Sequence, residues 1–204
     1  MKQESAAIDN TSGLRHEIRP VTAEDIVDRE NIRQLFARYS RGVDRQDADL
    51  VRSTYWPDGW DNHGVFEGTV DEFVANFLKI WPTLKMQHML GQIYIDIHGN
   101  EANTESYFMA YHRLGTEGST VDMLLGGRYV DRLEKRNGEW RLLQRNAVYD
   151  WYRDFGDSQP WDSPWFAGIV PGSNSLGSTT KDLSWDMFAR LPLQRGVPRN
   201  HARR

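Results

Sequence analysis

The chain has 204 residues, a formal net charge of −4, a pI near 5.9 and no cysteine. This charge argues against a nucleic-acid partner, and the missing thiols exclude disulfides, thiolate metal sites and cysteine nucleophiles. The sequence shows neither a signal peptide nor a stretch long enough to span a bilayer, so we expect a cytoplasmic protein with no membrane partner. Eight Trp, eight Tyr and eight Phe favour a pocket for a flat apolar ligand or a large subunit interface.

The N-terminal part is predicted to be a polar arm over residues 1–22, followed by a helix. Thr22 is the expected N-cap of this helix, and Asp25 completes a capping-box pattern. We expect Gly42 to break it. The apolar residues that fall on one face of this helix are Ile26, Val27, Ile32, Leu35, Phe36 and Tyr39.

The remaining elements follow from changes in the hydrophobic period. A second helix over 47–55, a turn at Pro57-Asp58-Gly59, a strand over 60–66 and a third helix over 69–81 are expected. From residue 85 the period is two, which predicts strands over 85–97, 102–114, 120–134 and 139–152. Turns are expected at 98–100 and 135–138, and the second carries the Asn-Gly signature of a tight hairpin.

Helices followed by long antiparallel strands indicate an α+β fold. We expect three N-terminal helices packed in a strongly curved, mostly antiparallel sheet that forms a conical pocket. The domain is predicted over residues 23–153. Residues 154–204 form an extension whose aromatic side chains argue against a wholly disordered tail. It is expected to cover the pocket mouth or a neighbouring subunit.

Asp44 and His88 are the first candidate catalytic residues. Asp44 closes the first helix, and His88 stands in the apolar strand that begins near residue 85. A carboxylate and an imidazole on apolar elements need partners when they are buried, and each can serve the other. An Asp that holds an imidazole in one tautomer makes it a general base, without a metal or nucleotide. The alternative is a core histidine satisfied by backbone and an Asp that forms a turn.

Other polar and aromatic side chains are candidates for the same pocket. Arg145 lies on a strand that otherwise reads as buried, so it needs an anionic substrate group or a carboxylate such as Asp150 or Glu105. His63 is expected to be a second polar group of the pocket. The further candidates for substrate contact are Trp60, Tyr107, Tyr111 and Tyr149, although alternation does not decide which face of a strand lines the pocket.

A metal site is the alternative use of the histidines. Asp61, His63, His88 and His112 could together satisfy zinc or iron. The sequence contains no compact histidine motif beyond Asp61-x-His63, so we expect no metal and no other cofactor.

This layout resembles the SnoaL-like branch of the nuclear transport factor 2-like superfamily over about residues 25–152. Gly42-Val43-Asp44 looks like the segment that bears the catalytic Asp in lindane-type dehydrochlorinases and bile-acid dehydratases, and the strand around His88 looks like the one that bears their His. Arg145-Asn146-Ala147 resembles the dehydrochlorinase segment whose Arg faces the cavity. Tyr39 stands where the dehydratases have a Tyr and the dehydrochlorinases a Lys, while His63 replaces a dehydratase Tyr.

The resemblance implies a cofactor-independent lyase acting on an apolar, aromatic or polycyclic small molecule. His88 would be the base, Asp44 its orienting partner, and Tyr39 and Arg145 the groups that stabilise developing charge. Loss of water is the first expectation. Loss of formaldehyde from a lignin-derived diarylpropane diol is the second, and isomerisation the third. The resemblance also implies a homo-oligomer, with a trimer favoured over a dimer.

Two hypotheses from other classes remain open at this point. One is a non-catalytic ligand-binding protein that uses the same pocket. The other is a small subunit of an aromatic-ring dioxygenase, which would contribute structure to a complex with an iron–sulfur subunit.

Overall fold

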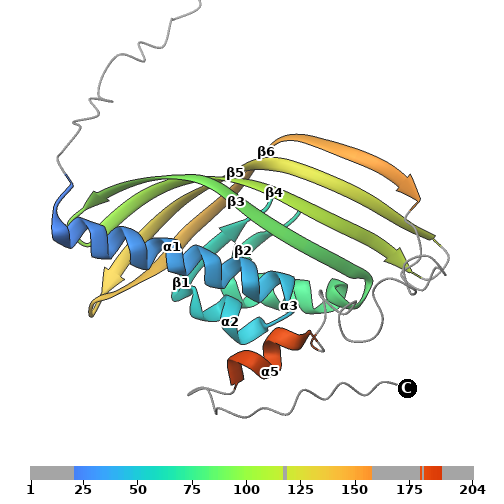
Figure 1. Ribbon diagram of the computed structural model, residues 1–204, viewed down its shortest axis with the longest axis horizontal. Helices are drawn as coiled ribbons and strands as arrows, with labels where there is room; N and C mark the ends of the chain where they lie inside the picture. The colour runs from blue at the N-terminus through green and yellow to red at the C-terminus, as the bar shows by residue number, and fades with distance from the viewer. Residues whose placement is uncertain (1–20, 117–118, 158–179, 181, 190–204) are drawn as a thin grey trace, which may run out of the picture.

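A computed structural model describes residues 21–116, 119–157, 180 and 182–189 (Figure 1). The helices are α1 Ala23–Asp44, α2 Ala48–Ser53, α3 Val70–Ile80 and α5 Leu183–Ala189, and a 3-10 turn, η1 Trp81–Thr83, follows α3. The strands are β1 Tyr55–Asn62, β2 Glu67–Thr69, β3 Leu84–His98, β4 Glu101–Thr116, β5 Ser119–Arg136 and β6 Glu139–Asp157. Residues 1–20 of the arm expected over 1–22, and residues 158–179, 181 and 190–204 of the aromatic extension, lie outside the described residues.

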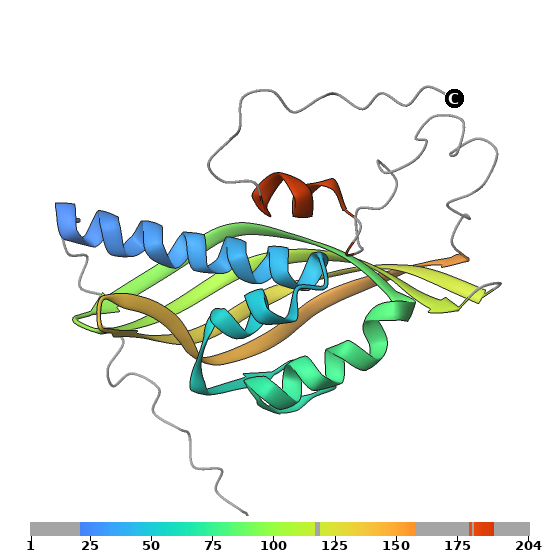
Figure 2. The same cartoon turned by 90° about the horizontal axis from the view of Figure 1, so that it is seen from below.

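The strands form one sheet with the order β2-β1-β6-β5-β4-β3. All neighbouring pairs are antiparallel except β1 and β6, which are parallel. The sheet arches over α1, α2 and α3, and it does not close, because β2 and β3 remain its edges (Figures 1 and 2). The predicted α+β class with a curved, mostly antiparallel sheet is confirmed.

The start of α1 agrees with the sequence and its end does not. Thr22 is the N-cap, and its side chain and that of Asp25 form the predicted capping box. The helix continues two residues past Gly42, to Asp44. A Cβ at Gly42 would lie 2.8 Å from Cγ2 of Val51, so this glycine lets α2 approach closely and does not break the helix.

Two predicted turns have different outcomes. The turn at Pro57-Asp58-Gly59 is wrong, because these residues lie inside β1, where the pairing with β6 shifts between Tyr55 and Trp60. The hairpin at Asn137-Gly138 is confirmed. Both of its residues have positive φ, 53° and 83°, which is the conformation that an Asn-Gly hairpin turn adopts.

Strand pairing assigns the two faces of the sheet. We call the side that carries His88, Phe108 and Ala110 the inner face, because it looks toward the helices and contributes most of the sheet's buried side chains. The opposite side is the outer face. The hydrophobic core lies between the helices and the inner face. Its largest fully buried side chains, apart from Arg145, are Trp140, Tyr39, Tyr55, Tyr129, Phe36 and Phe73.

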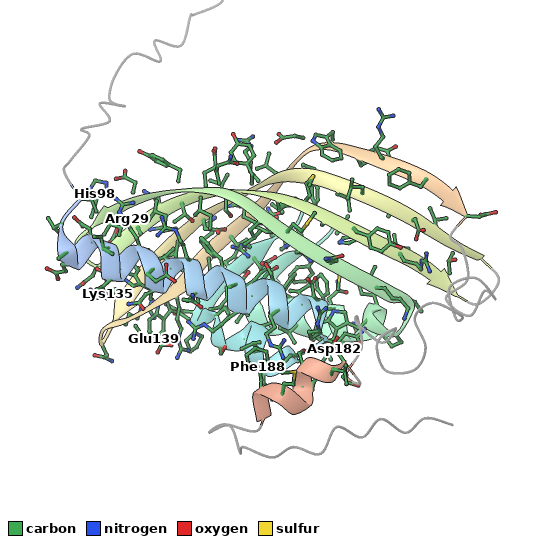
Figure 3. All side chains as sticks on the ribbon, in the orientation of Figure 1. Arg29, His98, Lys135, Glu139, Asp182 and Phe188 are labelled. Carbon is green, nitrogen blue, oxygen red and sulfur yellow. The ribbon has the colours of Figure 1, made fainter. Side chains whose placement is uncertain are left out.

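Charged and apolar side chains extend from the sheet and α1 on both sides (Figure 3). His98 and Arg29 lie near the N-terminal end of α1, whereas Asp182 and Phe188 lie near its C-terminal end (Figure 3).

Within the described residues, none of the helices combines the length and the apolar character that crossing a membrane requires.

Candidate active site

Asp44 and His88 meet at the C-terminal end of α1. Nδ1 of His88 donates to Oδ1 of Asp44 at 2.7 Å, and the backbone N–H of His88 donates to Oδ2 at 2.9 Å. Both side chains are only 8% exposed. Because a carboxylate can only accept, the proton of the neutral imidazole must sit on Nδ1, which leaves the lone pair on Nε2. The arrangement has the geometry of a general base with its orienting partner.

The local sequence explains why the two residues reach one another. On α1, Leu35, Tyr39 and Val43 are buried against the core, which fixes the face from which the helix end presents Asp44. On β3, Met86 is buried like the core, and His88 follows it on the same face. The alternation of side chains along a strand therefore directs the imidazole toward α1.

His112 lies beside the dyad. It occupies β4 opposite Met86, and its ring centroid is 5.6 Å from that of His88. Burial, followed by the charge of His88, lowers the pKa of His112 to about 4. Nε2 of His112 is buried and has no hydrogen-bond partner within the described part of the chain. His112 is therefore a neutral imidazole at physiological pH.

A second His–Asp pair stands on β1 and the residue that follows it. Asp61 accepts from Nδ1 of His63 through Oδ1 and from the hydroxyl of Tyr55 through Oδ2. Asp61 is fully buried and the side chain of His63 is 11% exposed. The His63 ring stacks on Phe73 with centroids 5.0 Å apart. This pair is local in sequence, and within the described residues His63 is not grouped with the further ligands that a metal would need.

Tyr39 connects α1 with this second pair. Its hydroxyl lies 3.4 Å from Nε2 of His63, and Tyr39 is 1% exposed. Burial, and next the neighbouring Tyr129, raise the pKa of the Tyr39 phenol well above its ordinary value. The phenol therefore keeps its proton and serves as a hydrogen-bond donor.

Arg145 is enclosed in the core. It is 0% exposed, and its guanidinium lies 4.2 Å from the Tyr39 ring centroid and 4.1 Å from that of Tyr129. Nε and Nη2 donate to the two oxygens of Asp131 at 2.9 and 2.6 Å. The carboxylates considered as its partners, Asp150 and Glu105, bind Arg128 instead. Arg145 can thus reach a substrate only through another side chain, and Tyr39 is one that it touches.

The four aromatic candidates for substrate contact separate by face. Tyr107 and Tyr111 alternate with Phe108 and His112 on β4, so they lie on the outer face. The Tyr111 hydroxyl donates to Asp122 there, at 2.6 Å. Trp60 alternates with buried Asp61 and also points outward. The structure does not bring these three to the site, because neighbouring residues of a strand point to opposite faces.

Tyr149 is the aromatic candidate that faces inward. Its ring centroid is 5.9 Å from that of Phe108, and the residue is 45% exposed. The inner face near the dyads thus offers imidazoles, one partly exposed phenol and aromatic rings.

The alternative metal site requires three or four ligands around one point. In the parts of the chain that the structure describes, no three His, Asp or Glu side chains are grouped so that they could hold a metal ion. Asp44 and Asp61 each bind a different imidazole. The geometry is that of two separate His–Asp pairs.

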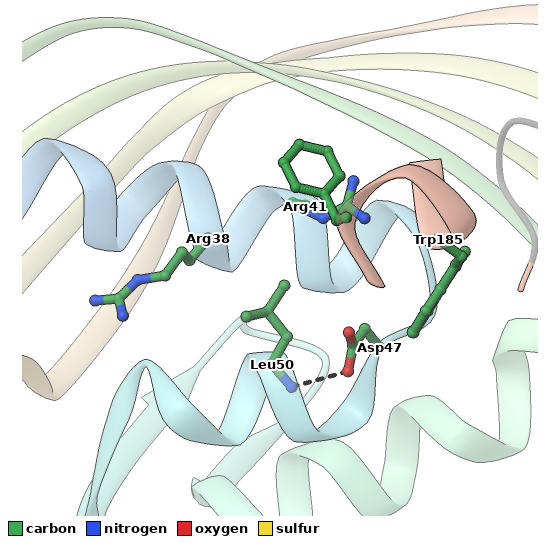
Figure 4. A pocket seen from close by; sticks show the side chains of 6 residues that line it. Arg38, Arg41, Asp47, Leu50 and Trp185 are labelled. Atoms are coloured by element: carbon green, nitrogen blue, oxygen red, sulfur yellow. Dashed lines mark hydrogen bonds between the residues drawn. The ribbon is translucent and has the colours of Figure 1, made fainter. Parts of the chain in front are cut away.

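A groove of about 460 Å³ lies on the other side of α1, between α1, α2 and α5 (Figure 4). Arg41 contacts α5 there, with its guanidinium 4.5 Å from the Phe188 ring centroid and Nη1 donating to Ser184 at 2.9 Å. The groove is lined by Arg38, Arg41, Asp47, Leu50, Trp185 and Phe188. None of these residues belongs to either His–Asp pair, so the groove is where α5 packs and is separate from the site.

Comparison with known proteins connects this geometry to a family. A family model described as a SnoaL-like domain matches residues 24–146. Curated protein sequences give no match. Solved structures with the same fold include a hexachlorocyclohexane dehydrochlorinase, LinA-type3, from Novosphingobium barchaimii LL02, with 17% identity and a TM-score of 0.57 over 66% of this chain and 97% of that one.

Two further structures extend the comparison. A protein named as a candidate scytalone dehydratase, from Novosphingobium aromaticivorans, has 22% identity and a TM-score of 0.56 over 66% of this chain and 91% of that one. The Kfla4162 protein of Kribbella flavida has 18% identity and a TM-score of 0.57 over 63% and 94%. At these identities the likeness establishes the fold.

Proposed function

The chain belongs to the SnoaL-like domain family, and on this basis we propose that it is a lyase that needs no metal or organic cofactor. The observation that carries the proposal is the double hydrogen bond between His88 and Asp44, which leaves Nε2 of His88 as the basic nitrogen. A base oriented in this way removes a proton from a bound substrate without a redox partner. Two of the similar solved structures are named as a dehydrochlorinase and a candidate dehydratase, and both names denote enzymes that catalyse eliminations.

The proposed substrate is an aromatic molecule with a hydroxyl leaving group. Phe108 and Tyr149 pack together on the inner face, and Phe73, Phe77 and Trp81 form a second cluster of packed rings on α3 and η1. Such rings favour flat apolar ligands, and a few polar groups among them fix the orientation. This composition supports a substrate of one or two aromatic rings.

The proposed reaction is an elimination. Nε2 of His88 takes a proton from a carbon next to the one that bears the hydroxyl, a carbon–carbon double bond forms, and the hydroxyl leaves as hydroxide, which takes a proton from solvent to become water. With a 1,2-diarylpropane-1,3-diol the same base takes the proton of the terminal hydroxyl instead. The carbon–carbon bond then breaks to release formaldehyde, and its electrons form the double bond as the benzylic hydroxyl leaves as hydroxide, which takes a proton from solvent to become water.

The other polar residues have supporting roles in this proposal. Arg145 is a positioning residue, because it has no exposed surface and acts on the site through the face of Tyr39. Tyr39 keeps its proton and presents it to Nε2 of His63. His112 stays neutral beside His88, so it adds no positive charge that would oppose proton uptake by the base.

The test is product analysis with defined aromatic compounds. Purified protein, with and without dialysis against EDTA, is incubated with 1,2-diphenylpropane-1,3-diol and with 3-hydroxy-1,2-diphenylpropan-1-one. Mass spectrometry detects the loss of water, and a colorimetric assay detects formaldehyde. We expect turnover with at least one compound, unchanged by EDTA and absent in His88→Gln. Return of the proton to the same skeleton would indicate an isomerase, and binding without any product would indicate a ligand-binding protein.

We also propose that the outer face is a contact between copies of the chain. Met89, Tyr107 and Met109 lie there on adjoining strands and are between 42% and 51% exposed. Trp151 adds an exposed ring on β6, paired with Gly126 of β5. An apolar surface of this kind is usually covered in solution, and a homotrimer or homodimer would cover it.

A further inference from the structure

The pair formed by His63 and Asp61 has no role in the reaction described so far. We propose that His63 is the second proton-transfer residue of the site, and that it protonates the hydroxyl group that leaves while His88 removes the substrate proton. This inference rests on the proposed elimination. It assigns one imidazole to each of the two protons that such a reaction moves.

The orientation of His63 suits this role. Both oxygens of Asp61 are engaged, one by Nδ1 of His63 and the other by the Tyr55 hydroxyl. The carboxylate therefore cannot rotate away without losing a buried hydrogen bond. It fixes the proton of the neutral imidazole on Nδ1, as Asp44 does for His88. Nε2 is then the nitrogen that gains and releases a proton, and the adjacent carboxylate stabilises the imidazolium when it forms.

The ring is also held in place by its neighbours. Phe73 stacks on it from α3, and Tyr129 of β5 lies with its centroid 5.9 Å away. The hydrogen-bond partner of Nε2 is the Tyr39 hydroxyl at 3.4 Å, which is longer than the usual O–H donor distance. A weak contact of this length leaves room for a substrate oxygen to take over Nε2. Tyr39 then donates to that oxygen, because its phenol does not ionise.

The titratable groups that surround His63 come from α1, β1 and β5. Asp61 faces Nδ1, Tyr55 and Tyr39 contribute hydroxyls, and Tyr129 contributes a ring. Beyond Tyr39 lies the Arg145–Asp131 ion pair, which is neutral as a unit. Among these groups, Asp61 is thus the carboxylate in direct contact with the His63 ring.

His63 and His88 both lie close enough to His112 for their charges to act on it. His112 is 5.6 Å from His88 by ring centroids, and the charges of both His88 and His63 act to lower its pKa. The neutral His112 therefore lies within electrostatic range of both proton-transfer residues.

The proposed step balances for a simple two-ring substrate, 3-hydroxy-1,2-diphenylpropan-1-one. Nε2 of His88 takes the proton from C2, and the electron pair of that bond forms the C2–C3 double bond. The C3–O bond breaks, and the oxygen leaves as water with the proton from Nε2 of protonated His63. His88 gains one proton and His63 loses one, so the total charge of the protein does not change.

Two probes separate the roles of the two histidines. 1,2-Diphenylethanone has an acidic C–H but no leaving group, so exchange of its protons in D₂O, followed by NMR, requires only the base. 3-Hydroxy-1,2-diphenylpropan-1-one requires the base and the acid, and formation of its enone is followed by absorbance and mass spectrometry. His63→Gln should slow enone formation by about 10²–10⁴-fold and leave exchange within about threefold of wild type. Asp61→Asn should give the same pattern, with slower enone formation and with exchange within about threefold of wild type.

The controls separate this inference from the proposed function. His88→Gln should lose both reactions, and His98→Gln, which removes an exposed imidazole from its partner Asp96, should lose neither. Wild type that catalyses neither reaction would overturn both proposals. His63→Gln that forms the enone at the wild-type rate would overturn only the role of His63, and so would equal loss of both reactions in that variant.

A second measurement needs no substrate. In protein labelled with ¹⁵N-histidine, long-range correlation spectra assign the tautomer of each neutral imidazole. His63 should carry its proton on Nδ1, and Asp61→Asn should shift the population toward the Nε2 tautomer. A His63 ring with its proton on Nε2 in wild type would overturn the proposal, because that nitrogen could not accept a proton.

Discussion

Asp44 accepts two hydrogen bonds from a single residue, His88, one from the backbone N–H and one from the imidazole. Replacing either partner should therefore affect catalysis more than folding. We expect His88→Gln and Asp44→Asn each to lower kcat by about 10²–10⁴-fold, because one removes the base and the other favours the wrong tautomer. Steady-state kinetics on the substrate found by product analysis measures this. His98→Gln is the matched control, and near wild-type turnover in either dyad variant would contradict the assignment.

Breaking the buried ion pair of Arg145 and Asp131 should destabilise the protein more than breaking an exposed ion pair on the same strand. Asp131→Asn leaves a fully buried guanidinium without its carboxylate, so the free energy of unfolding should fall by about 3–5 kcal/mol. Urea unfolding measures the change. The control is Arg132→Ala, which removes the exposed pair with Glu101 on the adjacent residue and should cost less than about 1 kcal/mol. Equal decreases in the free energy of unfolding of the two variants would contradict the argument that burial makes the Arg145–Asp131 pair costly to break.

Stability should fall with acid because of His112. Its pKa is about 4 in the folded protein and near 6.5 in the unfolded chain, so the unfolded state binds the proton first. Keeping His112 neutral costs no free energy above pH 6.5. As the pH falls from 6.5 to 4, the free energy of unfolding should decrease by up to about 3 kcal/mol because of this residue. Urea unfolding between pH 7 and 4.5 should show a steeper loss in wild type than in His112→Met, and parallel curves would rule out the buried neutral imidazole.

Gly127 should not tolerate a side chain. A Cβ there would lie 2.1 Å from the backbone oxygen of Val148, at a register shift between β5 and β6, and a strand cannot move as freely as a side-chain end. We expect Gly127→Ala to cost about 1–3 kcal/mol in thermal or urea unfolding. Gly91→Ala is the control, because its Cβ would meet only ordinary contacts with Tyr107 at 3.6 Å or more. Similar stability of the two variants would refute the steric argument.

The outer face can be tested for contact between copies with one charged substitution. Met109→Arg places a cation among exposed apolar side chains on β4 and should dissociate an oligomer that uses this face. Light scattering at micromolar concentration measures the mass. Val65→Arg is the control, because Val65 is 96% exposed between β1 and β2, at the opposite edge of the sheet from β3 and β4. A wild-type monomer would contradict the proposed assembly.

The sequence predicts the order of elements and the His88–Asp44 contact because both depend on local periodicity and on a simple need for partners. The partner of Arg145 could not be predicted in this way. Regular pairing counted from the Asn137-Gly138 turn would place Val130 opposite Arg145, but a register shift between Arg132 and Leu133 brings Asp131 there instead. Such an irregularity has no clear signal in the sequence.

The two faces of β4 could have been told apart from the sequence. Tyr107 and Phe108 are both aromatic and do not distinguish the faces, but Glu101, Glu105 and Arg113 alternate in step with Tyr107 and mark its side as the outer one. The second His–Asp pair also has a signal that could have been used. Asp61 and His63 are separated by one residue, and an acid and an imidazole at that spacing in a strand share one face.

The two buried His–Asp pairs differ in how far apart their members lie along the chain. Asp61 and His63 are separated by 2 positions, whereas Asp44 and His88 are separated by 44 and meet only when the end of α1 packs against β3. Partial opening of that helix end would abolish the base while the second pair stays assembled. Loss of turnover in mild urea should then precede the loss of β-sheet signal, and the activity of this protein would report on a single local docking event.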